Sequence, residues 1–447
     1  MKKFALIGHP LGHSLSPEIH SAIMAQAGID GSYGLLDIPP EDIPARMPAL
    51  LREYDGFNAT IPHKKAVIPF LSGLSDAAKR CGAVNTVCGG RGYNTDAAGF
   101  RSAGMPLEGA RVVLVGTGGV ASMMAAESVA AGAAALCVAP QTRELGEDFI
   151  SGLREKFPES HCEFSLAATE EDKGAAVAAA TVLLNGSPIG MWPKAGGIPV
   201  DPAALHAGLS VFDPVYCPTP SRLVLNARKA GARAVGGLKM LVCQAVEAQK
   251  IWNPGLSLDS EAIAEKLLPP LSADLWRKNP TKIVLTGFMG AGKSTVGKIL
   301  ADSLGIGFTD LDAEIVRDAG VTIPEIFAGK GEAGFREIET AVAGKILAES
   351  RSAVVASGGG FPVRDENRAL VRASNALVVH IDGDFETLWA RIATAGGRPL
   401  GKERDSAAAS YAARDPVYRA FCDAAVRTSA AATPSSVAGQ IAALLRA

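Results

Sequence analysis

A glycine-rich loop that ends in a lysine and a serine constrains this chain more than any other feature. Residues 287–294 read GFMGAGKS, which matches the pattern GxxxxGK[ST]. The apolar run 282–286 predicts a buried strand before the loop, and residues 295–301 predict a helix after it. In this context backbone N–H groups surround phosphates, Lys293 supplies a positive charge, and the Ser294 hydroxyl can bind Mg²⁺. A chance glycine-rich turn, the alternative, does not require these flanks. We therefore predict a nucleoside triphosphate site formed by Gly290, Ala291, Gly292, Lys293, Ser294 and Thr295.

Length and charge limit the remaining function classes. A chain of 447 residues is too long for one ordinary domain and suggests about three folding units. The net charge of -2 gives no electrostatic reason to expect nucleic acid or an anionic membrane as a partner. The 7 cysteines are scattered and form no CxxC pair, which is typical of reduced thiols. We therefore predict a cytoplasmic protein without a disulfide framework or a zinc site.

Two apolar stretches need a separate explanation. The N-terminal run 4–7 is too short for a signal peptide and reads as a first strand. The alanine-rich stretch 121–139 is long enough for a membrane span, but it contains Glu127 and Gly132. We expect a helix in its first part and a strand at 135–138 instead.

The N-terminal half alternates short apolar runs with helical patterns, which predicts a parallel, doubly wound α/β sheet. The clearest strand is 111–115, followed by a glycine turn and the alanine-rich helix. Such a turn brings a pyrophosphate close to a helix N-terminus, although the stretch is not a full GxGxxG, because Ala121 and then Ser122 follow Val120. The turn residues expected at a dinucleotide cofactor are Gly116, Thr117, Gly118, Gly119 and Val120.

Several loops of this half carry polar side chains whose roles the residues alone leave open. Ser16 is a good helix N-cap before Pro17. Lys64 lies in a loop, where most lysines are simply solvated. Asn85 and Asp96 are also typical of local Asx turns.

Eight segments in order across residues 1–255 resemble shikimate dehydrogenases: HSLSP, NATIPHK, GAVNT, GYNTD, GTGGV, NGSPIGM, DPVY and GGLKMLVCQA. The resemblance implies a substrate domain at about 1–101 plus 238–268 and a Rossmann-like cofactor domain at about 102–237. It implies reduction of 3-dehydroshikimate to shikimate, with Lys64 and Asp96 as the acid/base pair. A lysine beside an aspartate can deliver the proton that the new alkoxide needs. The implied substrate ligands are Ser14, Ser16, Thr60, Asn85, Asp96, Tyr216 and Gln244, and Gly237 is expected at the cofactor.

The cofactor assignment depends on one departure from the family pattern. NADP-specific members usually carry Asn-Arg-Thr after the second strand of the cofactor domain, whereas this chain has Pro140-Gln141-Thr142, followed by Arg143. We predict NADP, held through Arg143, and keep NAD as the alternative. Two rival functions also stay open: a quinate- or NAD-dependent paralogue, and a shikimate-binding regulatory module without catalysis. The presence of both Lys64 and Asp96 favours an active enzyme.

The C-terminal half follows a proline-marked connector, so we predict a linker at 269–280 and a second domain at 281–447. Asp310 and Asp312 alternate at an expected strand end and should point the same way. The segment 396–400 reads as a polar lid. In order, GFMGAGKST, DLD, FRE, SGGG, GGRPL and RDPVY resemble shikimate kinases, which implies a P-loop kinase domain with a parallel sheet.

The kinase resemblance assigns roles by matched position. Asp312 would engage the acceptor hydroxyl, and Arg336 and Arg414 would bind the substrate carboxylate, a task that suits guanidinium groups. Lys293 and Arg398 would neutralise the transferred phosphoryl group, as in other phosphoryl transfers. The other implied contacts are Gly358, Gly359 and Gly360 at the substrate, Arg398 also at the nucleotide, Arg391 at the adenine, and Ser294 with Asp310 at Mg²⁺.

The two resemblances support each other, because the product of the first reaction is the substrate of the second. We predict a bifunctional enzyme of the pathway to aromatic amino acids that uses NADPH and ATP. No nucleic-acid or membrane partner is expected.

Overall fold

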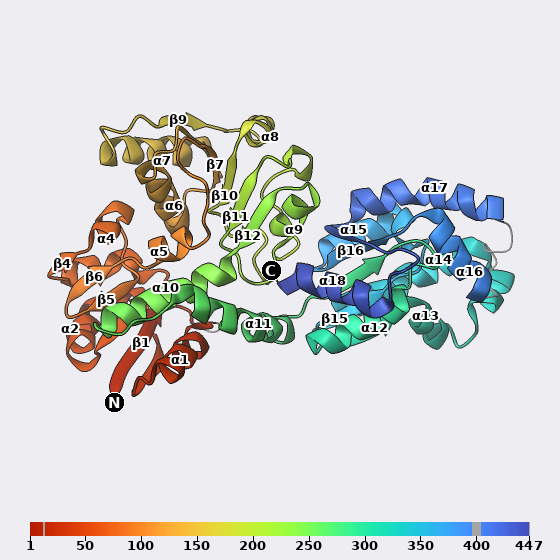
Figure 1. Ribbon diagram of the computed structural model, residues 1–447, viewed down its shortest axis with the longest axis horizontal. Helices are drawn as coiled ribbons and strands as arrows, with labels where there is room; N and C mark the ends of the chain where they lie inside the picture. Colours follow the sequence, from red (N-terminus) through yellow and green to blue (C-terminus); the bar gives the residue numbers. More distant parts are fainter. Residues whose placement is uncertain (12–13, 396–403, 447) are drawn as a thin grey trace. The chain divides into compact units, whose positions relative to one another are not determined.

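The computed structural model describes residues 1–11, 14–395 and 404–446 (Figure 1). Two compact units are distinguished by their internal contacts. The first comprises Met1–Pro188, Pro199–Pro214 and Ala232–Leu271, and the second comprises Ile189–Ile198, Val215–Gly231 and Ser272–Ala447. Two segments from the expected cofactor domain therefore group with the C-terminal half.

The first unit contains a mixed sheet in the order β2-β1-β3-β5-β6-β4. Its strands are β1 (Lys2–Gly8), β2 (Gly31–Asp37), β3 (Gly56–Ala59), β4 (Gly73–Leu74), β5 (Thr86–Cys88) and β6 (Arg91–Tyr93). Only β5 runs antiparallel to its neighbours β3 and β6 among the described pairings. The associated helices are α1 (Ser16–Ala27), α2 (Ile43–Glu53), α3 (His63–Ala66), α4 (Asp76–Cys81), α5 (Asp96–Arg101) and α10 (Gly237–Trp252). Trp252 of α10 stacks on Phe4 of β1 with ring centroids 4.7 Å apart, so α10 packs against this sheet.

A second, fully parallel sheet of the first unit has the order β12-β11-β10-β7-β8-β9. Its strands are β7 (Arg111–Val115), β8 (Ala135–Ala139), β9 (Glu163–Leu166), β10 (Val182–Asn185), β11 (Ser210–Asp213) and β12 (Arg233–Gly236), and its helices include α6 (Gly119–Ala130), α7 (Arg143–Lys156) and α8 (Glu170–Ala179). Strand order reverses between β7 and β10, and ligands of such sheets bind outside the carboxyl ends of the strands at this point. The helix and strand predicted for the alanine-rich stretch are confirmed.

The second unit is built on a parallel sheet in the order β14-β15-β13-β16-β17. The strands are β13 (Lys282–Thr286), β14 (Gly307–Asp310), β15 (Ala353–Ala356), β16 (Leu377–Asp382) and β17 (Ala424–Arg427). The helices are α9 (Arg222–Lys229), α12 (Lys293–Leu304), α13 (Leu311–Ala319), α14 (Ile323–Ala348), α15 (Asp365–Ala373), α16 (Phe385–Ala395), α17 (Arg404–Phe421) and α18 (Pro434–Arg446). The predicted α/β class and the parallel sheet of the C-terminal half are confirmed.

The stretch expected as a linker is largely helical. Helix α11 (Ser260–Lys278) continues through Pro269 and Pro270. Each interior proline costs a helix about 3 kcal/mol. Leu271, Leu275 and Trp276 are 8%, 5% and 3% exposed, and burial of such side chains contributes about 1.5–3 kcal/mol each. Burial of this apolar face offsets the cost of the two prolines. A linker predicted from the prolines alone does not take this burial into account.

No described helix combines the length and apolarity needed to cross a bilayer. Each of the 7 cysteines, all of which lie in the described ranges, is a free thiol.

Candidate active sites

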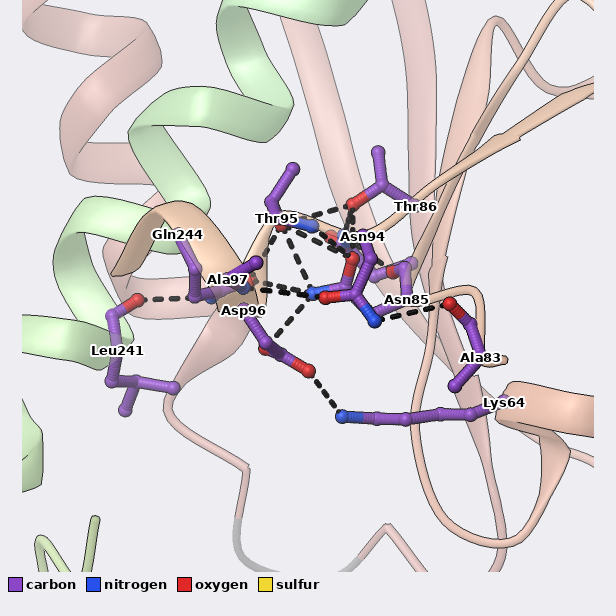
Figure 2. Close-up of polar contacts among 11 residues, drawn as sticks. Lys64, Ala83, Asn85, Thr86, Asn94, Thr95, Asp96, Ala97, Leu241 and Gln244 are labelled. Atoms are coloured by element: carbon purple, nitrogen blue, oxygen red, sulfur yellow. Dashed lines mark hydrogen bonds and ion pairs between the residues drawn. The ribbon is translucent and has the colours of Figure 1, made fainter. Parts of the chain in front are cut away.

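The first candidate site is centred on an ion pair between Lys64 and Asp96 (Figure 2). Lys64 lies in the short helix α3 after β3, and Asp96 opens helix α5. The Lys64 Nζ and Asp96 Oδ2 atoms are 2.5 Å apart, and the side chains are 24% and 15% exposed. The pair is sheltered enough for a strong charge-assisted hydrogen bond and open enough for a ligand to reach it.

Asn85 holds the second oxygen of the Asp96 carboxylate (Figure 2). Its Nδ2 donates to Asp96 Oδ1 at 2.9 Å and to Thr95 Oγ1 at 3.0 Å, while its Oδ1 accepts the Thr95 N–H at 2.7 Å. Because these partners are ten or more residues away, Asn85 acts across two loops rather than in a local Asx turn. One carboxylate oxygen therefore faces Lys64 and the other is fixed by an amide.

Gln244 reaches the same network from α10 (Figure 2). Its Oε1 accepts from Thr95 Oγ1 at 3.3 Å and from Asn85 Nδ2 at 3.4 Å, and its Nε2 donates to the Leu241 carbonyl at 2.9 Å. Gly99 permits this approach, since a Cβ there would lie 2.6 Å from the Met240 carbonyl oxygen. The structure thus brings together Lys64, Asn85, Asp96 and Gln244 from four separate elements.

The remaining predicted substrate ligands are Ser14, Ser16, Thr60 and Tyr216. Ser16 is the first residue of α1 and not its N-cap, so that prediction was wrong; Leu15 occupies the cap, without a side-chain hydrogen bond. Ser14 Oγ instead accepts the Ser16 N–H at 3.2 Å. Thr60 follows β3 and donates its N–H to the Ile7 carbonyl at 2.9 Å. Tyr216 lies in Val215–Gly231, which groups with the second unit, and its substrate contact stays a prediction.

The sequence reading missed a buried polar chain behind the site. The Tyr33 hydroxyl donates to Asn58 Oδ1 at 2.8 Å, and Asn58 Nδ2 donates to the Asn85 carbonyl and to Thr86 Oγ1, both at 3.0 Å. Asn58 is 5% exposed within β3, and a polar residue inside a short apolar strand was the available signal. These contacts anchor the backbone of Asn85.

The glycine turn after β7 has the geometry expected for a pyrophosphate site. Gly116 adopts φ +92°, and a Cβ there would lie 3.1 Å from the backbone of Gly186 after β10. Gly118 is the N-cap of α6 and Gly119 its first residue, so backbone N–H groups of the helix end are available for an anion. A Cβ on Gly237 would lie 1.9 Å from the Pro214 carbonyl oxygen, which restricts that position to glycine. Thr117 lies in the same glycine turn, and Val120 lies in the first turn of α6.

Arg143 opens helix α7, which Thr142 caps by accepting the Leu145 N–H at 3.4 Å. The Arg143 Nη1 lies 3.6 Å from Glu147 Oε1, and both side chains are 61% exposed. A surface ion pair of this kind is weak, so it leaves the guanidinium available to a phosphate.

The second candidate site is a cavity of about 450 Å³ at the carboxyl edge of the third sheet, lined by Gly290, Gly292, Lys293, Ser294, Thr295, Asp310, Asp312, Ala356, Ser357, Gly358, Gly359, Arg391 and Ile392. Lys293 is 9% exposed, and its Nζ donates to the carbonyls of Gly287 at 2.8 Å and Phe288 at 3.1 Å. Ser294 Oγ donates to Asp310 Oδ2 at 2.5 Å. A hydroxyl and a carboxylate are oxygen ligands of the kind that Mg²⁺ prefers, so these residues fit that ion.

Asp310 and Asp312 do not share a strand. Asp310 ends β14 and caps α13, accepting the N–H groups of Asp312 at 3.1 Å and Ala313 at 3.3 Å. Asp312 therefore lies in the first helical turn, and the prediction of strand alternation was wrong. Asp312 nevertheless faces the cavity, because a Cβ on Gly358 would lie 3.1 Å from its Oδ1.

The predicted carboxylate-binding arginines lie on two helices near the glycine loop after β15. Arg336 is on α14 and packs so closely on Gly360 that a Cβ there would lie 2.5 Å from its Nη2. Arg414 is on α17, one turn before Tyr418, whose hydroxyl donates to the Gly359 carbonyl. Burial raises the pKa of Tyr418 to about 12, so it stays protonated. Arg398 and the expected lid at 396–400 lie outside the described residues.

Glu339 was not identified from the sequence, although it lies three residues after Arg336 on the same helix. Its Oε2 lies 2.8 Å from Arg336 Nη1, and the side chain is 1% exposed. Burial raises the pKa of Glu339, an effect that the charge of Arg336 opposes. Glu339 thus orients the guanidinium from behind.

If Arg336 binds the carboxylate of the phosphate acceptor, as predicted from the sequence, we expect Glu339→Gln to raise the KM for that acceptor about tenfold, because the ion pair with Arg336 is replaced by a hydrogen bond to an uncharged side chain. Steady-state kinetics at saturating ATP would measure this. Glu337→Gln, on the exposed side of the same helix, is the matched control. An unchanged KM in Glu339→Gln would show that Arg336 does not depend on this partner.

A separate cluster of His380, Asp382 and Asp415 has ligand atoms within 4.8 Å of one another. Arg419 already pairs with both carboxylates, its Nη2 2.7 Å from Asp382 and its Nε 2.8 Å from Asp415. The cluster therefore holds a guanidinium in place of a metal ion.

Two family models match different parts of this chain. The model described as "Shikimate dehydrogenase substrate binding domain" matches residues 6–87, and the model described as "Shikimate kinase" matches residues 289–446. The chain is 35% identical over 258 residues to the NADP⁺ shikimate dehydrogenase of Moorella thermoacetica, which covers 56% of this chain and 87% of that protein.

Two solved structures give the same result for the N-terminal half. Shikimate 5-dehydrogenase from Thermus thermophilus, in complex with NADP(H) and shikimate, is 31% identical with a TM-score of 0.52, covering 59% of this chain and 98% of that one. The enzyme from Listeria monocytogenes, in complex with shikimate and NAD, is 26% identical with a TM-score of 0.55, covering 60% of this chain and 96% of that one. The first family model contains Lys64 and Asn85, and the second contains Lys293 and Arg336.

Proposed function

This chain belongs to the shikimate dehydrogenase family and carries a shikimate kinase domain, and on that premise we propose how its residues perform the two reactions. It is a bifunctional enzyme of the shikimate pathway. The first site reduces 3-dehydroshikimate to shikimate with NADPH, and the second phosphorylates the 3-hydroxyl of shikimate with ATP. The observation that carries the first assignment is the Lys64–Asp96 pair, fixed from behind by Asn85.

In the first site, Lys64 acts as the proton donor. NADPH, when bound at the glycine turn, supplies the hydride that adds to the carbonyl carbon of the substrate. The oxygen then takes a proton from the Lys64 ammonium, which Asp96 orients through its 2.5 Å contact. In the reverse direction neutral Lys64 accepts the hydroxyl proton. Ser14, Ser16, Thr60, Asn85, Tyr216 and Gln244 are the proposed substrate ligands.

In the second site, positioning and charge neutralisation carry the reaction. Asp312 orients the attacking hydroxyl and accepts its proton, while Arg336 and Arg414 bind the carboxylate of shikimate. Lys293 neutralises the transferred phosphoryl group, and Ser294 and Asp310 hold Mg²⁺. Arg398, beyond the described residues, is proposed to share the role of Lys293.

The first experiment measures nicotinamide reduction by the purified protein with shikimate, comparing NADP⁺ with NAD⁺ in the absence of ATP. Turnover that prefers NADP⁺ is the expected result. Preference for NAD⁺ would indicate that Gln141, which replaces the arginine usual in NADP-specific members, changes the cofactor specificity. Binding of shikimate without turnover, beside an active kinase, would support the regulatory-module alternative and overturn the proposed reductase.

Arg143→Ala is expected to raise the KM for NADP⁺ about tenfold and to leave that for NAD⁺ unchanged, because a hydrogen bond between charged groups contributes about 1.5–3 kcal/mol. Arg154→Ala, exposed at the other end of α7, is the control. Equal effects on both cofactors would contradict a contact with the 2′-phosphate.

A cytoplasmic location, and the absence of nucleic-acid and membrane partners, remain predictions.

A further inference from the structure

Helix α6 of the first unit carries a buried carboxylate that neither candidate site uses. Glu127 is the only ionisable residue of this helix, and its side chain is 6% exposed. It lies in the last turn, where the negative end of the helix dipole disfavours an anion. A buried carboxylate in this position must be stabilised by partners from outside the helix.

Two arginines from other helices supply that stabilisation. Arg101, the last residue of α5, places Nη1 2.5 Å from Glu127 Oε2, and Arg80 of α4 places Nη2 3.6 Å from Glu127 Oε1. Arg101 also lies at the helix end where a positive charge is favourable. We call these three residues the Glu127 clamp.

The clamp joins two helices whose other ends lie at the first candidate site and at the glycine turn. Helix α5 begins at Asp96, and α6 begins at the glycine turn. At 1.5 Å per residue, the clamp lies about 8 Å along α5 from Asp96 and about 12 Å along α6 from Gly119. Both helices are short and pack against each other (Figure 1), so a shift at the clamp displaces both helix starts.

A second contact supports the same connection. The rings of Phe100 on α5 and Phe212 on β11 meet edge to face, with centroids 5.2 Å apart. Helix α5 is therefore held by an apolar contact to β11 of the second sheet and by an ion pair to α6. The apolar contact sets the distance between α5 and β11, while the ion pair sets the orientation of α5 relative to α6.

We propose that Glu127 is a positioning residue for hydride transfer, which sets the separation between the Lys64–Asp96 pair and the nicotinamide through Arg101 and Arg80. Neither Glu127 nor its partners touch the reacting atoms. The proposal rests on the proposed roles of Lys64 and Asp96. Full activity of a Lys64→Ala enzyme would overturn those roles, whereas the test below concerns the clamp.

The test uses the full-length protein with Glu127→Gln, which keeps the shape of the side chain and removes its charge. A misplacement near 1 Å can cost about a hundredfold in rate, so we expect kcat for shikimate oxidation to fall between about tenfold and about a hundredfold. Hydride transfer should then limit the rate, and deuterium at the oxidised carbon of shikimate should slow the variant more than the wild type. The kinase activity of the same chain should stay unchanged and reports on folding of the second unit. An isotope effect and kcat equal to those of the wild type would overturn the proposal.

Two further variants keep the test decisive if Glu127→Gln does not fold. Arg101→Lys retains the charge and should stay within about threefold of the wild type, while Arg101→Met should reproduce the loss and the enlarged isotope effect. Glu170→Gln breaks an exposed ion pair with Lys173 at 2.7 Å on α8 and is the matched control. Equal activities of Arg101→Lys, Arg101→Met and the control would show that the clamp does not position the site.

Discussion

Replacement of Lys64 by alanine is expected to lower the turnover of shikimate oxidation by a factor of about 10² to 10⁴, the range for loss of a general acid/base. Lys64 is the only group we assign to deliver the proton. When its ammonium is removed, Asp96 loses the 2.5 Å contact and keeps the hydrogen bond from Asn85. Shikimate binding should change far less than kcat, because Asn85 and Gln244 keep their own contacts.

Two internal comparisons make this result specific. Lys65→Ala removes an exposed lysine from the next position and should behave like the wild type. The ATP-dependent reaction of the Lys64→Ala protein should also be unaffected, which reports on folding of the second unit, while retained binding of shikimate reports on folding of the first. If Lys64→Ala retained full reductase activity, the acid/base assignment would be wrong.

Replacement of Lys293 by alanine should give the opposite pattern, with kinase turnover reduced by a factor of about 10² to 10³ or more, the effect of removing one preorganised charge-stabilising group. The buried side chain lines the cavity that we propose for the nucleotide, so alanine would leave the developing phosphoryl charge without this cation. Coupled assay of ADP release with saturating shikimate would measure the loss.

Lys298→Ala, on the exposed face of the same helix, is the matched control for Lys293→Ala. Reduction of NADP⁺ by shikimate in the Lys293→Ala protein should match the wild type. A kinase that survived this change would place the phosphoryl-stabilising charge elsewhere, with Arg398 as the next candidate.

The sequence predicted those parts of the sites whose chemistry is contained in short segments. The P-loop and the glycine turn after β7 each depend on a few neighbouring residues, and the geometry of each is compatible with its expected role. Lys64 and Asp96 are 32 residues apart, and their pairing was predicted only through the family resemblance. Both α/β halves also follow from local periodicity, because strands buried on both faces leave long apolar runs.

What the sequence did not predict depends on contacts between distant segments. Glu339 contacts Arg336, Asn58 contacts the Asn85 backbone, and Glu127 forms an ion pair between two helices. Each of these residues looks like an ordinary charged or polar residue in its own segment. Asp312 lies in a helix because Asp310 caps it, which a rule based on strand alternation does not consider. Buried leucine and tryptophan side chains explain why α11 continues through two prolines.

The position of Lys293 has a consequence for how nucleotide binds. Its ammonium already has oxygen partners in the carbonyls of Gly287 and Phe288. A triphosphate that binds this cation must therefore compete with the carbonyls of the loop. Its affinity reflects the difference between the contacts of Lys293 with the phosphates and those with the two carbonyls. The same two carbonyls are available to the ammonium when no nucleotide is bound, so release of the nucleotide does not leave this buried charge without oxygen partners.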